Sequence, residues 1–392
     1  MNKRKTQALL ITLSSEDFKK LVFLFIPLLI FLISLVVIEL GARLINNRLI
    51  LVARLEAELL SRKFGDLDNL SIDPNLNHEN LKILNSEYGE HVKRCMVHYG
   101  TWSNAIKSEE SMHMPDYQGQ FLNVVNGLRV TTNSPAVIKN RIIIFGGSTV
   151  FCGEVPDNLT SCSALQSYIN DNEVLATVIN YGRHGSTLQN RLLYLERSEI
   201  DRDDLVLFWF GVNELGWKLM EGKTNVPFSI FILNRVSDGF KLFSKNFAFF
   251  NFLSQFFDFL ILEPVSTFYS YRDLKRSLQK LEQLSQSRGF EYRVFLQPNL
   301  LTKTVHTNRE QAIFEFFLNR RRGRITKRLL DKNYPRFRHL HRRYRGIDAS
   351  SIFSDTTQEV FVDWCHLNSV GNQIAAEFIF DSLKANGLFD RF

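Results

Sequence analysis

The apolar positions of this chain fall into short unbroken runs separated by helical stripes, a pattern that predicts an α/β fold. Residues 142–145, Ile-Ile-Ile-Phe, lie between Arg141 and a pair of glycines, which is typical of a fully buried strand. Runs of similar character follow at residues 174–180, 205–210, 292–296 and, more briefly, 360–362. Strands that alternate with helices form a parallel sheet covered on both sides, and we expect that architecture here.

Helical stripes occupy the segments between these strands. Leu188, Leu192 and Leu195 share one helical face. They predict a helix over about residues 187–198, with Ser186 as its cap. The other expected helices cover about residues 160–170 with Asp157 or Asn158 near the cap, residues 272–288, and a closing segment to about Ala385 with Gly387 just past its end.

The segment that precedes the sheet, residues 63–135, is polar and irregular in pattern. Asn, Asp, His and Gly recur throughout it, and no long apolar stripe is evident. We expect only a few short strands there, such as residues 121–125 and 128–132. The main domain is therefore expected to cover residues 136–392.

The longest apolar run lies near the N-terminus, at residues 21–38, and contains no charge. A helix of that length spans roughly 27 Å, close to the hydrocarbon thickness of a bilayer. We therefore expect residues 1–20 to form a cytoplasmic tail and residues 21–40 a transmembrane anchor in contact with membrane lipid. A cleavable signal peptide is the alternative, and the lack of an A-x-A site argues against it.

Basic residues on the two sides of this run indicate its orientation. Five precede it and three follow nearby: Lys3, Arg4, Lys5, Lys19 and Lys20 against Arg43, Arg48 and Arg54. This excess favours a single-pass protein of the cell (inner) membrane, with the N-terminus inside and the main domain on the periplasmic or extracellular side. Apolar residues at helical spacing within residues 41–62 predict a stalk helix that continues from the membrane.

A Phe-rich segment, residues 216–270, interrupts the alternation of strands and helices and is expected to be an insertion. Asp258 lies within its second apolar run, which argues against a further membrane span. A helical cap packed on the sheet domain is one interpretation. The other is a lid that lies against the bilayer or binds acyl chains.

Charge and composition narrow the classes of partner. The formal net charge is +7, and residues 319–346 contain twelve Lys and Arg against one acid, Asp331. This basic run is either a solvated helix face or a contact with lipid headgroups or an anionic polymer. No aromatic residues are spaced for base stacking, so nucleic acid is not an expected partner. The four cysteines lack metal-like spacing, which argues against a zinc site.

Candidate chemistry gathers in four turns, each of which follows a predicted strand. These turns hold Ser148, Gly185, Asn213 and the pair Asp363 and His366. A serine nucleophile needs a base that takes its proton, a carboxylate that orients the base, and donors that hold the developing oxyanion. We expect His366 and Asp363 to fill the first two roles. The N–H groups of Ser148 and Gly185 and the Asn213 amide are the expected donors.

Each of these residues also has an ordinary structural interpretation. An Asn after a strand is usually a turn former, an Asp-x-x-His pair is usually a cap or surface pair, and Gly185 fits a simple turn. Their joint occurrence in this order, each after a strand, favours the catalytic interpretation.

These blocks resemble those of the SGNH (GDSL-like) hydrolase superfamily. The matching residues are 146–149 (Gly-Gly-Ser-Thr), 180–185, 211–214 (Gly-Val-Asn-Glu) and 363–366 (Asp-Trp-Cys-His). The resemblance covers about residues 141–388. It implies a three-layer αβα sandwich with a parallel sheet, the flavodoxin-like SGNH fold, and a Ser-His-Asp esterase without metal or other cofactor. Members with a membrane anchor often act on O-acyl groups of cell-surface or secreted polysaccharides.

The sequence departs from the family pattern in two places. Gly147 replaces the Asp of the commonest Gly-Asp-Ser form, which leaves the nucleophile intact. Glu214 stands where Asp is usual, which puts the local turn geometry in doubt. Cys152 and Cys365 each lie close to a block residue, and a disulfide between them is a further hypothesis.

Three functions compete as explanations of this sequence. The first is a membrane-anchored esterase, a carbohydrate O-deacetylase acting on an acylated glycan. The second is an acyltransferase in which a sugar hydroxyl replaces water at the same triad. The third is a non-catalytic binding or assembly component of an envelope polysaccharide system, for which Ser148 and His366 would be dispensable.

Overall fold

A computed structural model of the chain describes residues 73–99, 114–136, 140–215 and 263–392. The predicted anchor at 21–40, the predicted stalk helix at 41–62 and most of the predicted insertion at 216–270 lie outside the described residues. Within the described ranges, no helix is both long enough and apolar enough to cross a bilayer.

Eight strands form one sheet in the order β1-β2-β3-β5-β4-β6-β7-β8. Its parallel part consists of β4 (Asn140–Gly146), β5 (Ala176–Gly182), β6 (Leu205–Phe210), β7 (Glu291–Leu296) and β8 (Gly346–Asp348). Ile143 at the centre pairs with Ile179 on one side and Val206 on the other. The predicted parallel arrangement of the first four runs is therefore confirmed.

Three short antiparallel strands extend the sheet at one edge, so the sheet is mixed rather than wholly parallel as predicted. They are β1 (Tyr117–Gln118), β2 (Asn123–Val125) and β3 (Leu128–Arg129), and Arg129 pairs with Asn180 of β5. Asn126 and Gly127 turn the β2–β3 hairpin with φ of 52° and 74°. An Asn-Gly pair tolerates these positive angles, which explains the hairpin at this site.

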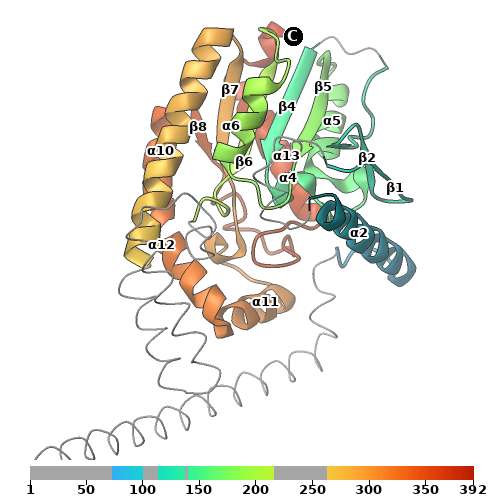
Figure 1. The fold of residues 1–392 in the computed structure, drawn as a ribbon. Helices are drawn as coiled ribbons and strands as arrows, with labels where there is room; N and C mark the ends of the chain where they lie inside the picture. Colours follow the sequence, from blue (N-terminus) through green and yellow to red (C-terminus); the bar gives the residue numbers. More distant parts are fainter. Residues whose placement is uncertain (1–72, 100–113, 137–139, 216–262) are drawn as a thin grey trace, which may run out of the picture. The chain divides into compact units, whose positions relative to one another are not determined.

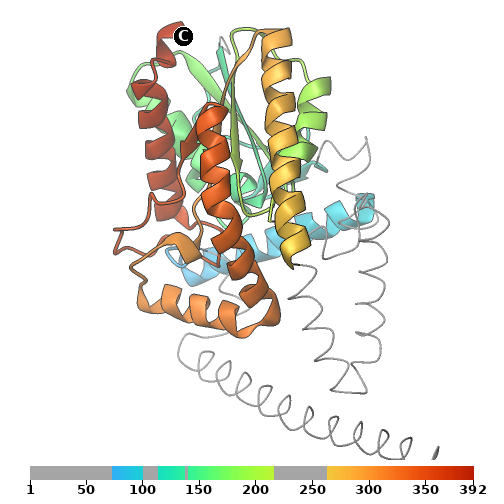
Figure 2. The same cartoon turned by 90° about the vertical axis from the view of Figure 1, so that its left-hand side faces the viewer.

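Helices cover both faces of the sheet and make three layers (Figures 1 and 2). Ile142 and Ile144 of β4 pack in a cluster with residues of α5 (Ser161–Asp171) and α13 (Ser369–Ala385). Their neighbours in the strand pack in a second cluster on the opposite face. That cluster includes residues of α6 (Leu188–Arg197), α10 (Glu263–Arg288) and α12 (Arg321–Arg343). The predicted αβα sandwich is confirmed for the described chain.

The predicted caps of two helices are wrong by one or a few residues. Thr160, rather than Asp157 or Asn158, caps α5 by accepting a hydrogen bond from the Ser163 N–H. Thr187, rather than Ser186, caps α6. Asp157 is instead bound by the buried Arg129, at 2.6 Å from the guanidinium Nε, and begins the short helix η3 (Asp157–Leu159).

Several elements differ from the sequence predictions. Residues 360–362 form no strand: only an isolated bridge joins Phe361 to Leu367. The segment predicted to be irregular contains the helix α2 (His78–Tyr99). α10 begins at Glu263, nine residues before its predicted start at Arg272. The remaining elements are α4 (Ser148–Phe151), α11 (Asn308–Asn319), η5 (Leu300–Thr302) and η6 (Phe389–Arg391).

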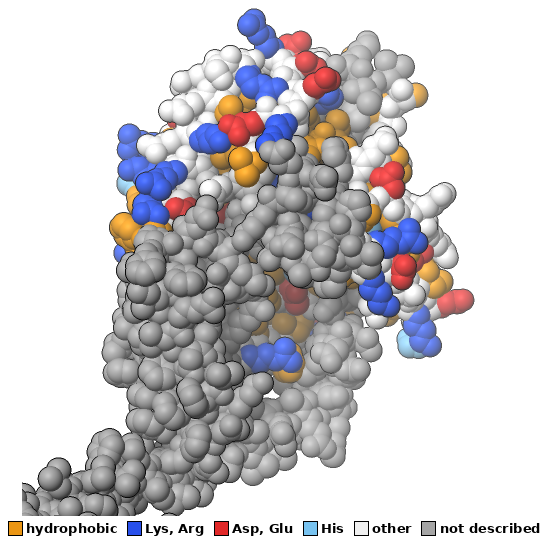
Figure 3. Space-filling model, in the orientation of Figure 1, with side chains coloured by type: hydrophobic (Ala, Val, Ile, Leu, Met, Phe, Trp, Pro, Cys, Tyr) orange, Lys and Arg blue, Asp and Glu red, His pale blue; other side chains and the backbone are white. Residues whose placement is uncertain are grey.

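The basic run forms α12, which is strongly amphipathic. Leu329, Phe337 and Leu340 are buried against the sheet. Arg336 and Arg342 are exposed on the opposite side, and Figure 3 shows Lys and Arg side chains on the flank where α10 and α12 lie. Exposure of this face agrees with both interpretations of the basic run.

All four cysteines are buried free thiols. The Sγ of Cys152 lies 3.6 Å from the Oδ1 of Asn372, whereas the Sγ of Cys365 lies 3.7 Å from the Nδ1 of His366. The hypothesis of a Cys152–Cys365 disulfide is therefore wrong for this structure, because the two side chains face different partners.

Candidate active site

Ser148 lies at the carboxyl end of the central strand β4 and is the first residue of α4. The turn predicted to hold Ser148 is therefore helical. A close approach of backbones fixes this turn, because a Cβ on Gly182 of β5 would lie 2.1 Å from the Phe151 backbone nitrogen. Asn180 reinforces the contact by donating to the Val150 carbonyl oxygen at 2.9 Å. The serine hydroxyl is thus held at the edge of the sheet where ligands of parallel α/β folds bind.

His366 and Asp363 lie on the loop that leads into α13. The Nε2 of His366 is 2.7 Å from the Oγ of Ser148, and its Nδ1 is 2.7 Å from the Oδ2 of Asp363. The other carboxylate oxygen of Asp363 accepts the N–H groups of Cys365 and His366 at 2.8 and 2.7 Å. The structure therefore joins the three predicted residues in one hydrogen-bonded line.

The carboxylate and the imidazole shift one another's pKa in opposite directions. Burial opposes the charged form of His366, but the carboxylates of Asp363 and Glu154 outweigh it and raise the pKa well above 6.5. Burial likewise disfavours ionised Asp363, yet His366 and the hydrogen bonds hold the pKa of Asp363 below its ordinary value. An imidazole that gains a proton is therefore stabilised here, as general base catalysis requires.

Asn213 and the loop that carries Gly185 lie beside the residue before Ser148, because a Cβ on Gly147 would lie 3.4 Å from the Ser186 carbonyl oxygen and closer still to the Asn213 amide. The N–H groups of Ser148 and Gly185 donate no hydrogen bond to another described residue. Gly185 adopts φ of 64°, a left-handed conformation that favours glycine. The Asn213 amide donates to the Ser186 carbonyl oxygen at 3.0 Å. A Cβ on Gly147 would lie 2.3 Å from its nitrogen, so the amide sits directly over the residue before Ser148.

Glu214 resolves the doubt about the turn that carries Asn213. Its side chain accepts the N–H of Gly211 at 2.8 Å and the N–H of Leu188, the first residue of α6, at 2.8 Å. The longer side chain of Glu thus ties the Asn213 turn to the loop that carries Gly185. One buried carboxylate therefore links the turn of Asn213 to the loop of Gly185, which carry two of the three predicted oxyanion donors.

Two residues near the imidazole were not predicted as part of the site. Glu154 is 3% exposed, and its Oε1 lies 3.7 Å from the Nε2 of His366. Tyr88 of α2 packs over the adjacent Gly153, where a Cβ would lie 2.3 Å from the tyrosine ring. Glu154 lies six residues after Ser148, so its proximity in sequence was a usable signal. The sequence carries no such signal for Tyr88, because no local sequence pattern indicates that α2 packs beside the sheet.

Three side chains at the site, Asp363, Cys365 and His366, carry atoms of the kinds that bind metal ions. Ligand atoms of Asp363, Cys365 and His366 lie within 4.8 Å of one another. However, burial raises the pKa of the Cys365 thiol to about 12, which disfavours the thiolate that metals bind. The Nδ1 of His366 is already hydrogen-bonded to Asp363. These residues therefore fit proton transfer better than metal binding.

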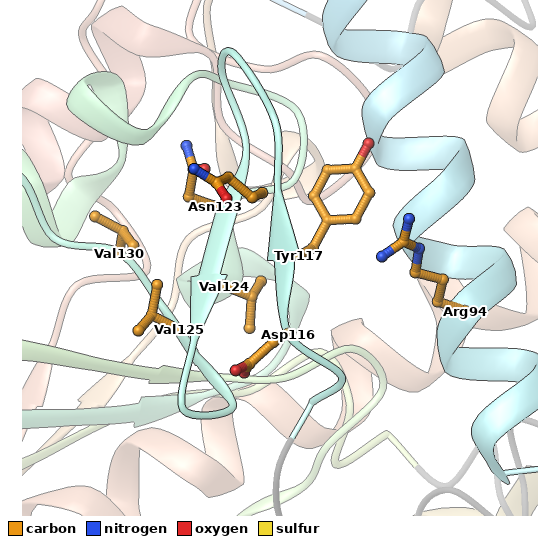
Figure 4. A pocket seen from close by; sticks show the side chains of 8 residues that line it. Arg94, Asp116, Tyr117, Asn123, Val124, Val125 and Val130 are labelled. Atoms are coloured by element: carbon orange, nitrogen blue, oxygen red, sulfur yellow. The ribbon is translucent and has the colours of Figure 1, made fainter.

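A hollow of about 630 Å³ lies beside the β1–β2 hairpin (Figure 4). The Arg94 guanidinium of α2 lies 4.9 Å from the centre of the Tyr117 ring at its wall. The remaining lining residues are Asp116, Gln118, Asn123, Val124, Val125 and Val130. This set includes no serine, cysteine or histidine, so we place the candidate chemistry at Ser148.

A buried ion pair anchors the loop that carries Asp363 and His366. Lys303 and Glu310 are both fully buried, and the Nζ of Lys303 is 2.5 Å from the Oε2 of Glu310. The Oε1 of Glu310 also accepts the N–H of Val360 at 3.0 Å. Lys303 donates to the carbonyl oxygen of Gln358 at 2.6 Å. The pair therefore positions the chain just before Asp363 and His366.

Replacing Glu310 with alanine should lower the free energy of unfolding by about 3–5 kcal/mol, because it leaves the Lys303 ammonium buried and unpaired. Thermal or denaturant unfolding measures this loss. The control is Asp331→Ala, which removes an exposed pair with Lys327 and should cost at most about 0.5 kcal/mol. Equal effects of the two substitutions would contradict the anchoring role of Glu310.

Comparison with known proteins gives similarity at the level of solved structures alone. No family model and no curated protein matches the sequence. A member of the lipolytic protein G-D-S-L family from Veillonella parvula DSM 2008 is 13% identical, with a TM-score of 0.36 over 62% of this chain and 97% of that chain. Axe2, an acetylxylan esterase from Geobacillus stearothermophilus, is 11% identical, with a TM-score of 0.35 over 62% and 94%. The acetyl xylan esterase AlAXEase is 15% identical, with a TM-score of 0.36 over 62% and 99%.

Proposed function

We propose that this protein is a serine hydrolase that cleaves ester bonds, with Ser148 as nucleophile, His366 as general base and Asp363 as its orienting carboxylate. The observation that carries the proposal is the continuous line from the Ser148 hydroxyl through both imidazole nitrogens to Asp363. The N–H groups of Ser148 and Gly185 and the Asn213 amide are the proposed oxyanion donors, which complete the set that acyl transfer needs.

The reaction proceeds in two halves. The Ser148 oxygen attacks the ester carbonyl carbon while its proton passes to the Nε2 of His366, and the carbonyl oxygen becomes an oxyanion facing the three donors. Collapse of this intermediate breaks the bond to the leaving alcohol, which takes the proton from Nε2 and departs. Ser148 is then acylated. Water then attacks the acyl carbon in the same way, which releases the acid and restores the serine hydroxyl.

For the substrate we propose O-acetyl groups on a cell-surface or secreted polysaccharide. The resemblance of the four sequence blocks to SGNH hydrolases supports this choice. The uncharged run at residues 21–38 and the excess of basic residues before it support a membrane-anchored protein with its catalytic domain on the outer side. An acyltransferase would use the same acyl-enzyme, so the two activities differ only in the second nucleophile.

Labelling of the full-length protein with a fluorophosphonate probe tests the proposal. The wild type should react covalently, and peptide mapping should place the adduct on Ser148. Ser148→Ala should abolish the adduct, whereas Ser167→Ala on α5 should label like the wild type. Absence of labelling in a folded wild-type protein would favour the non-catalytic alternative.

A further inference from the structure

A second carboxyl group faces the imidazole of His366 from the side opposite Asp363. Asp363 binds Nδ1, whereas the Oε1 of Glu154 lies 3.7 Å from Nε2, the nitrogen that also contacts Ser148. The side chain of Glu154 is 4% exposed. Its Oε2 is buried and has no hydrogen-bond partner among the described residues. The triad mechanism gives this carboxyl group no role.

The main chain around Glu154 is held in place. The carbonyl oxygen of Glu154 accepts the N–H of Asp73 at 3.2 Å, and Tyr88 covers Gly153. Besides the phenol of Tyr88 and the thiols of Cys152 and Cys365, the titratable and charged groups that act on Glu154 are His366, Asp363 and Arg129. Burial raises the pKa of Glu154, while His366 and Arg129 oppose that shift. Glu154 is therefore a fixed carboxyl group whose charge depends on the imidazole beside it.

The spacing between Glu154 and His366 suits a bridging molecule better than a direct bond. A separation of 3.7 Å exceeds a normal hydrogen bond, but one water oxygen can lie within hydrogen-bonding distance of both atoms. In the free protein, the hydroxyl of Ser148 is hydrogen-bonded to Nε2 of His366. Once Ser148 is acylated, its oxygen has no proton to give, and Nε2 must take up the second nucleophile.

We propose that Glu154 and His366 together bind the water that hydrolyses the acyl-enzyme, and that this site selects water over an alcohol as second nucleophile. The inference rests on the proposed function, because it concerns the second half of that reaction. It assigns the protein to hydrolysis rather than acyl transfer.

In the proposed step, the water directs one O–H to Nε2 of His366 and the other to the carboxylate of Glu154. The water oxygen bonds to the acyl carbon as its first proton passes to Nε2. The π electron pair of the carbonyl group moves onto the carbonyl oxygen, which becomes the oxyanion. The bond from the acyl carbon to the Ser148 oxygen then breaks, and Nε2 returns the proton to that oxygen. Glu154 stays ionised and keeps the second proton oriented. An alcohol has only one O–H, so its carbon substituent would face the carboxylate without a hydrogen bond.

Two substitutions in the full-length protein test the proposal. Glu154→Met removes the acceptor and the charge at similar volume, and Glu154→Gln keeps an acceptor oxygen but removes the charge. With p-nitrophenyl acetate, the burst reports acylation and the steady state reports deacylation. For Glu154→Met we expect acylation within about threefold of wild type and deacylation roughly 100-fold slower, because the nucleophile is no longer positioned. Intact mass should show acetylated protein accumulating, and Glu154→Gln should be intermediate.

Two further readouts separate this role from a structural one. The negative charge of Glu154 raises the pKa of His366, so its removal should move the acid limb of acylation to lower pH in both variants. With methanol present, the ratio of methyl acetate to acetate should rise in Glu154→Met. The substitution removes the acceptor for the second O–H of water, whereas methanol has no second O–H and loses no hydrogen bond. Glu87→Gln serves as control: this buried carboxylate binds the N–H groups of residues 120–122 and should leave the ratio unchanged.

The outcomes are distinguishable. Equal slowing of acylation and deacylation, or an unchanged product ratio in methanol, would overturn the inference while leaving the esterase intact. Wild-type protein that never carries an acetyl group on Ser148 would overturn the proposed function as well. Should Glu154→Met fail to fold, Glu154→Gln still decides, because its acid limb and deacylation rate must both change.

Discussion

Replacing His366 with alanine should lower kcat for ester hydrolysis roughly a million-fold, the scale seen when a serine hydrolase loses its base. The Nε2 of His366 is the one base within hydrogen-bonding distance of the Ser148 hydroxyl among the described residues. Without it, the hydroxyl keeps its proton and is a poor nucleophile. Steady-state kinetics on a soluble acetate ester measures the loss.

The fold should survive this substitution, because the backbone of residue 366 makes the structural contacts. Its N–H donates to Asp363 at 2.7 Å, and its carbonyl oxygen accepts the N–H of Val362 at 3.0 Å. The double variant Ser148→Ala/His366→Ala should be no slower than either single variant, because the two residues act as one unit. His339→Ala, at an exposed position on α12, is the matched control and should retain full activity. Losses that multiply in the double variant would contradict the proposed unit.

Asp363→Asn should lower kcat about 10⁴-fold while leaving the thermal unfolding temperature close to that of the wild type. The asparagine oxygen can still accept the N–H groups of Cys365 and His366, so the turn persists. Its amide nitrogen, however, replaces the oxygen that faces Nδ1 of His366 and can only donate. The imidazole then carries its proton on Nε2 and cannot take one from Ser148.

The comparison that tests this explanation is Asp363→Ala. Alanine removes the turn contacts as well as the orienting oxygen, so it should lower both kcat and the unfolding temperature. Asparagine should lower kcat alone. Activity of Asp363→Asn within tenfold of the wild type would show that Asp363 does not set the imidazole tautomer.

Local rules were sufficient to predict the strands that precede Ser148 and Asn213. Residues 205–210 are apolar throughout, and β6 has these same bounds because a central parallel strand is buried on both faces. Ser148 and Asn213 each follow such a run, β4 and β6 respectively. The topology of a parallel sheet then brings the ends of the strands to one edge.

The remainder depends on contacts between distant parts of the chain. Asp157 has the chemistry of a cap, yet the buried Arg129 binds it from 28 residues away in sequence and Thr160 takes the cap. The segment at 360–362 has strand-like composition, but Glu310 accepts the N–H groups of Val360 and Phe361, so they join no sheet ladder. Pattern alone does not show such partners.

The Ser148–His366 contact joins residues 218 positions apart. The hydroxyl and its candidate base therefore meet only when the fold brings together the two ends of this long segment. Late closure of so large a loop is entropically costly and slow. Until this contact forms, the Ser148 hydroxyl lacks its candidate base and stays a poor nucleophile.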